Sequence, residues 1–108
     1  MSDDDVDRES YYRDAHDLWI RGCRGDVLTP KEHVQFRSLA RDRFYTFVMS
    51  AGHSQVEGDG DKVRLLVRSL ALDLVRSPGL EREWHDCEFS QDSFGSLVTA
   101  MLEEVRGQ

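Results

Sequence analysis

The sequence has few cysteines, no long apolar run and no excess of positive charge, and each absence excludes a class of protein. Its 108 residues include two cysteines, Cys23 and Cys87, which are too few for a disulfide-based scaffold and are expected to be free thiols. No stretch approaches the roughly 18 consecutive apolar residues of a membrane-spanning helix. The net charge of −7 disfavours binding to nucleic acid or to an anionic membrane, because both require basic surface.

The amino-terminal segment also lacks the pattern of a targeting signal. It starts with a run of aspartates rather than with a basic segment followed by an apolar one, so we expect no secretory signal and no transit peptide. The expected location is therefore the cytoplasm. We expect residues 1–9 to be an acidic, partly disordered lead-in and residues 10–108 to form a single helical domain.

Motifs for catalysis, cofactors and metals are lacking as well. There is no nucleophile elbow and no glycine-rich phosphate loop. The histidines have no metal-binding spacing, and His85 and Cys87, two residues apart, would face apart on a helix. The acidic segment 57–61 lacks the glycine and glutamate positions that a calcium-binding EF-hand needs. The sequence therefore predicts no cofactor and no metal site, and it gives no support for an enzyme.

Apolar residues at helical spacing are what the sequence does contain. Apolar residues make up 39% of the chain and charged residues 32%, a balance typical of helices that each expose one face to water. Four main helices are predicted: from Ser10 to the segment 22–25, over about 30–51, over about 61–76, and from Ser90 through Val105; a short one is predicted over 78–86. The predicted fold class is therefore all-α, a compact bundle of four main helices plus one short helix.

Capping residues set the boundaries of the first two helices. Thr29, Pro30 and Glu32 have the spacing of an N-cap, a first-turn proline and a capping box. Ser10 is predicted to cap the first helix, which should stop within the glycine-containing segment 22–25. Gly52 is predicted to end the second helix, and residues 52–60 are expected to form a flexible loop.

Similar signals mark the later helices. Ser77 and Pro78 are predicted to begin the short helix. Ser90 is predicted to cap the last helix, with Phe89 and Phe94 forming a hydrophobic staple across its start. Apolar residues occupy most of the circumference of the helix over 61–76, so we expect it to be the most buried.

The first functional hypothesis is a non-enzymatic interaction or regulatory module, either a homodimer or a binder of a protein partner. Tryptophan and tyrosine are favoured at interfaces, and a terminal amphipathic helix is a natural docking element. The alternative is that these residues simply close the core of the chain itself. The predicted interface residues are Tyr12, Trp19, Trp84 and Met101.

The second hypothesis is a small anionic-ligand-binding domain with a central arginine patch. Arg37 and Arg41 lie one turn apart in the second helix, and Arg64 and Arg68 one turn apart in the third. Like charges at this spacing destabilise a helix, so these arginines either bind a ligand or are neutralised by acids such as those of the amino-terminal segment. A third hypothesis, an acidic nucleic-acid mimic, is disfavoured by the mixed charges of the central helices.

Several features of the stretch from Leu18 to Leu97 occur together in a known group of proteins. They are a tryptophan in the first helix, a Leu-Thr-x-x-Glu entry to an aromatic-rich second helix, a Ser-Pro-Gly turn before a tryptophan, and phenylalanines at the start of the last helix. Here they are Trp19, Leu28 to Glu32, Ser77 to Gly79, Trp84, Phe89 and Phe94. In these features the chain resembles uncharacterised bacterial helical proteins of unknown function. The resemblance implies a helical domain and no activity or site.

Overall fold

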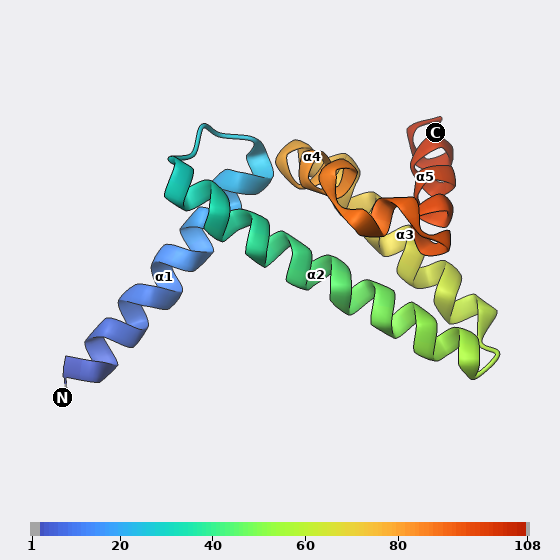
Figure 1. Ribbon diagram of the computed structural model, residues 1–108, viewed down its shortest axis with the longest axis horizontal. Helices are drawn as coiled ribbons and strands as arrows, with labels where there is room; N and C mark the ends of the chain where they lie inside the picture. Colours follow the sequence, from blue (N-terminus) through green and yellow to red (C-terminus); the bar gives the residue numbers. More distant parts are fainter. Residues whose placement is uncertain (1–2, 108) are drawn as a thin grey trace.

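The computed structural model describes the backbone of residues 3–107 and the side chains of residues 14–107, and it is helical almost throughout (Figure 1). The elements are α1 (Asp3–Arg24), α2 (Pro30–Val56), α3 (Gly60–Arg76), α4 (Pro78–Asp86), the 3-10 turn η1 (Glu88–Gln91) and α5 (Ser93–Arg106). No β-strand occurs between residues 3 and 107, so the predicted all-α class is confirmed.

The start of α2 has the predicted capping box. The Thr29 hydroxyl accepts a hydrogen bond from the Glu32 backbone N–H at 3.1 Å, and the Glu32 carboxylate accepts one from the Thr29 N–H at 3.0 Å. Pro30 occupies the first turn, where its missing N–H leaves no hydrogen bond unmade. These local interactions define the first residue of α2 as the sequence predicted.

Helix α1 ends at a left-handed glycine. Gly25 has a φ of 84°, and the two backbone hydrogen bonds of a Schellman motif join Gly25 N–H to Gly22 O and Asp26 N–H to Arg21 O. The predicted stop within residues 22–25 is confirmed. The predicted start is wrong, because α1 begins at Asp3 and passes through Ser10, which therefore does not cap it.

Helix α2 runs past Gly52, so the predicted end and most of the predicted loop over 52–60 are wrong. The left-handed residue is Gly58, with a φ of 77°, and the Asp59 N–H reaches back to Ser54 O to close a second Schellman motif. Gly52 does not have a positive φ. The connection to α3 is therefore a tight turn over residues 57–59, and Asp59 caps α3 by accepting from the Lys62 N–H at 3.0 Å.

The start of α5 also differs from the prediction. Residues 88–91 form η1, in which the Ser90 hydroxyl donates to the Cys87 carbonyl at 2.8 Å. Ser90 is therefore not the cap of α5, and Asp92 takes the N-cap position. The short helix α4 has the predicted bounds, although the Ser77 side chain makes no capping hydrogen bond.

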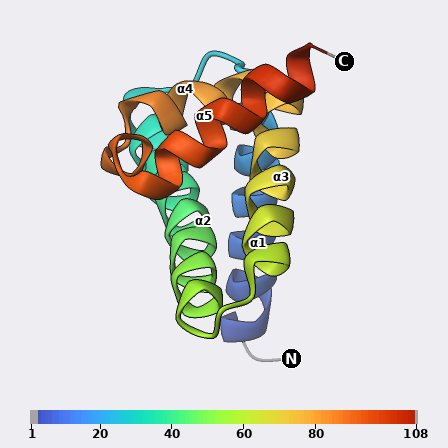
Figure 2. The same cartoon turned by 90° about the vertical axis from the view of Figure 1, so that its right-hand side faces the viewer.

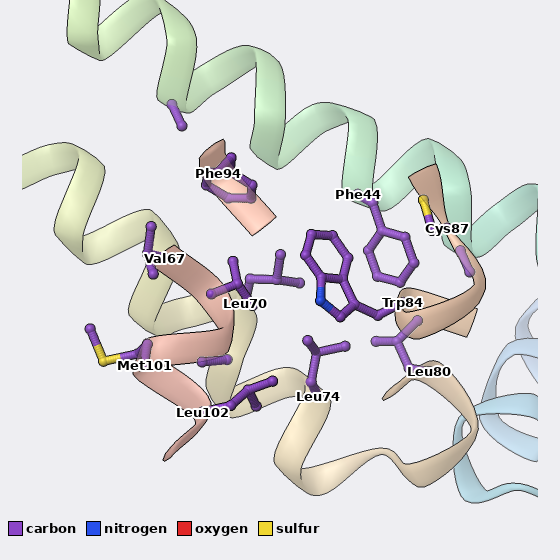
Figure 3. Close-up of a cluster of buried hydrophobic side chains, with 14 of the residues drawn as sticks. Phe44, Val67, Leu70, Leu74, Leu80, Trp84, Cys87, Phe94, Met101 and Leu102 are labelled. Atoms are coloured by element: carbon purple, nitrogen blue, oxygen red, sulfur yellow. The ribbon is translucent and has the colours of Figure 1, made fainter. Parts of the chain in front are cut away.

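Trp84 of α4 is the centre of the core (Figure 3). Its indole packs edge-on against Phe44 of α2, with ring centroids 5.1 Å apart, and against Phe94 of α5 at 6.4 Å. Leu70 and Leu74 of α3 pack against it from the other side. The core therefore lies where α4 and α5 cross the antiparallel α2–α3 pair, as Figure 2 shows for α5.

Helix α3 buries one face rather than most of its circumference, so the prediction that it is the most enclosed helix is wrong. Leu65 is 64% exposed and Val75 is also exposed. The reason is that α2, α4 and α5 all pack on the same side of α3, where Val67, Leu70 and Leu74 lie.

Two glycines allow α1 to approach the rest of the molecule. A Cβ atom on Gly79 would clash with the backbone carbonyl of Gly22, and one on Gly22 would clash with the ring of Phe36. The carboxyl end of α1 therefore packs directly on the first turn of α4 and on α2. The other half of α1 points away from the remaining helices (Figure 1).

The projecting half of α1 makes the molecule elongated. Its radius of gyration is 16.0 Å, compared with roughly 13 Å expected for a compact domain of this length. Among the described residues, no helix is both long enough and apolar enough to cross a membrane.

Candidate functional site

Glu83 of α4 is a buried acid held by two residues of α2. Its side chain is only 5% exposed; Arg37 Nε donates to Oε2 at 3.2 Å and His33 Nε2 lies 2.9 Å from Oε1. Because a buried carboxylate requires such partners, these contacts account for Arg37 and His33 structurally. Both carboxylate oxygens of Glu83 are therefore paired with side chains of α2.

The four arginines of the predicted ligand patch do not meet in one place. Arg43 on α2 pairs with Asp73 on α3 at 2.8 Å, and this register places Arg64 level with about residue 52 of the antiparallel neighbour. Arg37 is therefore about 20 Å from Arg64 along the helix axis. Arg41, Arg64 and Arg68 are exposed and form no ion pair with the side chains of residues 14–107.

Two of the predicted interface residues belong to the core instead. Trp84 is 0% exposed and Met101 is buried beside α3, so the prediction that Trp84 lies on an exposed aromatic face is wrong. Trp19 is half-buried against Phe36, with ring centroids 5.5 Å apart. The side chain of Tyr12 lies outside the described residues. The amphipathic stripe of α5 thus mainly closes the core of the chain, the alternative considered from sequence.

The two cysteines are free and poorly placed for nucleophilic chemistry. Burial raises the pKa of the Cys87 thiol and also the pKa of the half-buried Cys23 thiol. Since the thiolate is the reactive form, both residues are suited to packing rather than to catalysis. Within the described part of the chain, no three His, Cys, Asp or Glu side chains lie close enough to hold a metal ion.

Shallow hollows lie between the helices. One of about 550 Å³ opens between α1 and α2 beside Leu18, Arg21 and Gln35. Another of about 270 Å³ lies between the α1–α2 loop and α4, beside Phe36 and Gly79. Charged side chains line both hollows: Asp14 and Lys31 lie in the larger one, and Arg82 and the paired Glu83 lie in the smaller one.

An apolar row on the outer face of α2 is the feature that sequence reasoning missed. Tyr45, Met49, Gly52 and Val56 follow one another at intervals of four, three and four residues, the spacing of a helix-packing seam. Tyr45 and Met49 are each 54% exposed and Val56 is 89% exposed. We call these four residues the α2 row.

The α2 row extends sideways onto η1, where the ring of Phe89 lies 6.3 Å from that of Tyr45. Its spacing was visible in the sequence. The row is not predicted from the sequence because the predicted helix end at Gly52 leaves Val56 outside the helix.

No protein-family model, curated protein or solved structure matches this chain. The similarity to bacterial helical proteins therefore stays an expectation, and function has to be argued from the surface of the molecule.

Proposed function

We propose that this chain is a non-enzymatic protein-interaction module that binds an apolar helix of its partner along the α2 row. The observation that carries this proposal is the row itself. It places three large apolar side chains, with no charged residue among them, along three turns of one straight helix. Exposed apolar side chains scattered singly need no explanation, but an aligned set marks an interaction surface.

The projecting half of α1 supports the same function. A short helix without tertiary contacts is only marginally stable in water, yet α1 extends as a helix to Asp3 beyond its contacts with α2 and α4 (Figure 1). A second chain would pack on this segment, whose backbone points away from the other helices (Figure 1). The compact bundle expected from the sequence would then be completed by association.

A small anionic ligand at the four arginines is not favoured. Arg37 is neutralised by Glu83, and Arg41 lies on α2, whereas Arg64 and Arg68 lie one turn apart on α3. The partner that we propose is accordingly a protein, and neither a nucleic acid nor a cofactor.

Photo-crosslinking in the cell that makes the protein tests this function. A benzophenone side chain at position 49 should form adducts with a protein, whether another chain or a second copy. The same group at position 65 is the matched control, because Leu65 is a similarly exposed apolar residue on α3 outside the α2 row. Adducts at position 49 and none at position 65 are expected; no protein adduct at position 49 would overturn the proposal.

A further inference from the structure

Nothing in the fold of a single chain requires a glycine at position 52. It lies inside α2 without a positive φ, and a Cβ atom added there would meet nothing within 4 Å. Glycine in a helix interior is destabilising relative to alanine. No turn and no close contact within the chain compensates for this destabilisation. A helix of another molecule that packs closely against the α2 row would compensate for it.

The spacing of the α2 row is symmetric about the point midway between residues 50 and 51. In an antiparallel pair of identical helices centred there, residue 49 of each copy lies opposite residue 52 of the other, and residue 45 lies opposite residue 56. Met49 would then fill the space above Gly52 of the partner subunit, and Tyr45 would pack on Val56 of the partner subunit. A parallel pair would instead set Met49 against Met49 and leave the space at Gly52 empty.

We propose that the partner is a second copy of this chain, docked antiparallel along the α2 row. This inference rests on the proposed interaction function and names its partner. The pairing is isologous, so both Met49 side chains and both Gly52 positions are used in the same way, as closed two-fold symmetry requires.

The charges at the two ends of the row are complementary in this arrangement. Arg41 lies one turn before Tyr45, is exposed, and has no ion partner among the side chains of residues 14–107. Beyond Val56 the chain carries Glu57, Asp59 and Asp61. Antiparallel docking places Arg41 of each copy beside the acidic turn of the other. Asp42 lies beside Arg43 on the side of α2 that faces Leu66 of α3. It is therefore on the opposite flank of the row from Arg41.

Sedimentation equilibrium over a range of concentrations tests the partner. The unchanged chain should approach twice its monomer mass of 12.5 kDa. Gly52→Leu should weaken dimerisation by about tenfold or more, because it overpacks the close contact. The same substitution should raise the unfolding temperature of the monomer, because leucine is a better helix former. A lower unfolding temperature would show that Gly52 serves the fold instead and would overturn the proposal.

Three further variants separate the row from general surface effects. Leu65→Glu, which adds a charge at an exposed apolar site on α3, should leave the dimer unchanged. Arg41→Glu should weaken the dimer, and combining it with Asp61→Arg should restore much of the loss. Equal weakening by Leu65→Glu and Gly52→Leu would overturn the proposed surface.

Engineered disulfides test the orientation. Tyr45→Cys mixed with Val56→Cys should give the mixed disulfide, because the two positions face each other in an antiparallel pair. Tyr45→Cys alone should not crosslink, since its two copies would be about 16 Å apart along the axis, beyond the reach of a disulfide. Crosslinking of Tyr45→Cys to itself would show a parallel pair and overturn the inference.

Failure of this inference can be told apart from failure of the proposed function. A chain that stays monomeric at every concentration, yet forms adducts at position 49 with a different protein, overturns the second copy and leaves the interaction function standing. A chain that stays monomeric and forms no adduct at position 49 overturns both.

Discussion

Glu32 performs two tasks at the start of α2, and both require it to be ionised. One carboxylate oxygen accepts from the Thr29 N–H at 3.0 Å, and the other accepts from Arg21 Nη2 at 2.6 Å. The hydrogen bond and charge of Arg21, followed by the Thr29 backbone N–H, lower the pKa of Glu32 from 4.5 to about 2. The contact joins the carboxyl end of α1 to the first turn of α2.

Acid titration should reveal this contact. A carboxylate with a lowered folded-state pKa contributes stability above its unfolded pKa and loses it as the pH falls through the folded pKa. Glu32→Gln should therefore lower the free energy of unfolding at pH 6, and the difference from the unchanged chain should shrink between pH 4.5 and pH 2. Urea denaturation at several pH values measures it; a difference that does not change with pH would contradict the assignment.

Burial decides how much each arginine ion pair contributes to the free energy of unfolding. Arg37 pairs with Glu83, whose side chain is 5% exposed, whereas Arg24 pairs with Asp26, whose side chain is 43% exposed. Removing Arg37 leaves a buried acid with His33 as its remaining partner, so Arg37→Ala should lower the free energy of unfolding by about 1–3 kcal/mol. Arg24→Ala, the comparison variant, should lower it by roughly 1 kcal/mol or less. Equal losses in urea denaturation would show that burial of Glu83 is not decisive.

Gly52 and Gly58 show what sets the length of α2. Gly58 adopts a left-handed φ of 77° at the helix end, whereas Gly52 lies within the helix. Gly58→Ala should therefore destabilise the protein by about 1 kcal/mol, because an L side chain is strained there. Gly52→Ala should stabilise the monomer by roughly 0.5–1 kcal/mol. Thermal unfolding at a concentration below dimerisation measures both, and the same sign for the two variants would contradict the helix end at Gly58.

These glycines also show how far the sequence alone could predict the elements. The capping box of Thr29 and Glu32 was predictable because both partners lie within one turn. The end of α2 was not, because either glycine can adopt a left-handed φ and the sequence does not show that Ser54, beyond Gly52, is buried. Because the predicted helix ended at Gly52, Val56 was not assigned to it, and the α2 row was not predicted.

The candidate site was harder to predict than the helices because it depends on which faces are left uncovered. Tryptophan is a residue type favoured at interfaces, yet α2, α3 and α5 pack around Trp84. Arg37 could be assigned to an ion pair only once α4 was placed beside α2. Periodicity gives the faces of each helix but not its neighbours, so the exposed surface follows only from the packing of all five helices.

At the scale of the whole molecule, anchoring is uneven along α1. Its carboxyl end is fixed by the contact of Gly22 with Gly79 and by the half-buried Trp19, while its first half points away from the other helices (Figure 1). Local stability follows local packing. In dilute solution the backbone amides of residues 3–13 should therefore exchange with solvent close to the rate of an unstructured chain, and those of α2 around Phe44 should be strongly protected.

Hydrogen exchange followed by mass spectrometry at two protein concentrations measures this difference. Peptides covering residues 18–24 are the internal control, since they belong to the same helix but are anchored. If association supplies contacts to the first half of α1, protection of residues 3–13 should rise with concentration while that of residues 18–24 changes little. Strong protection of residues 3–13 in the dilute monomer would mean that this half of α1 folds against its own chain, and the elongated shape would then not be that of the monomer in solution.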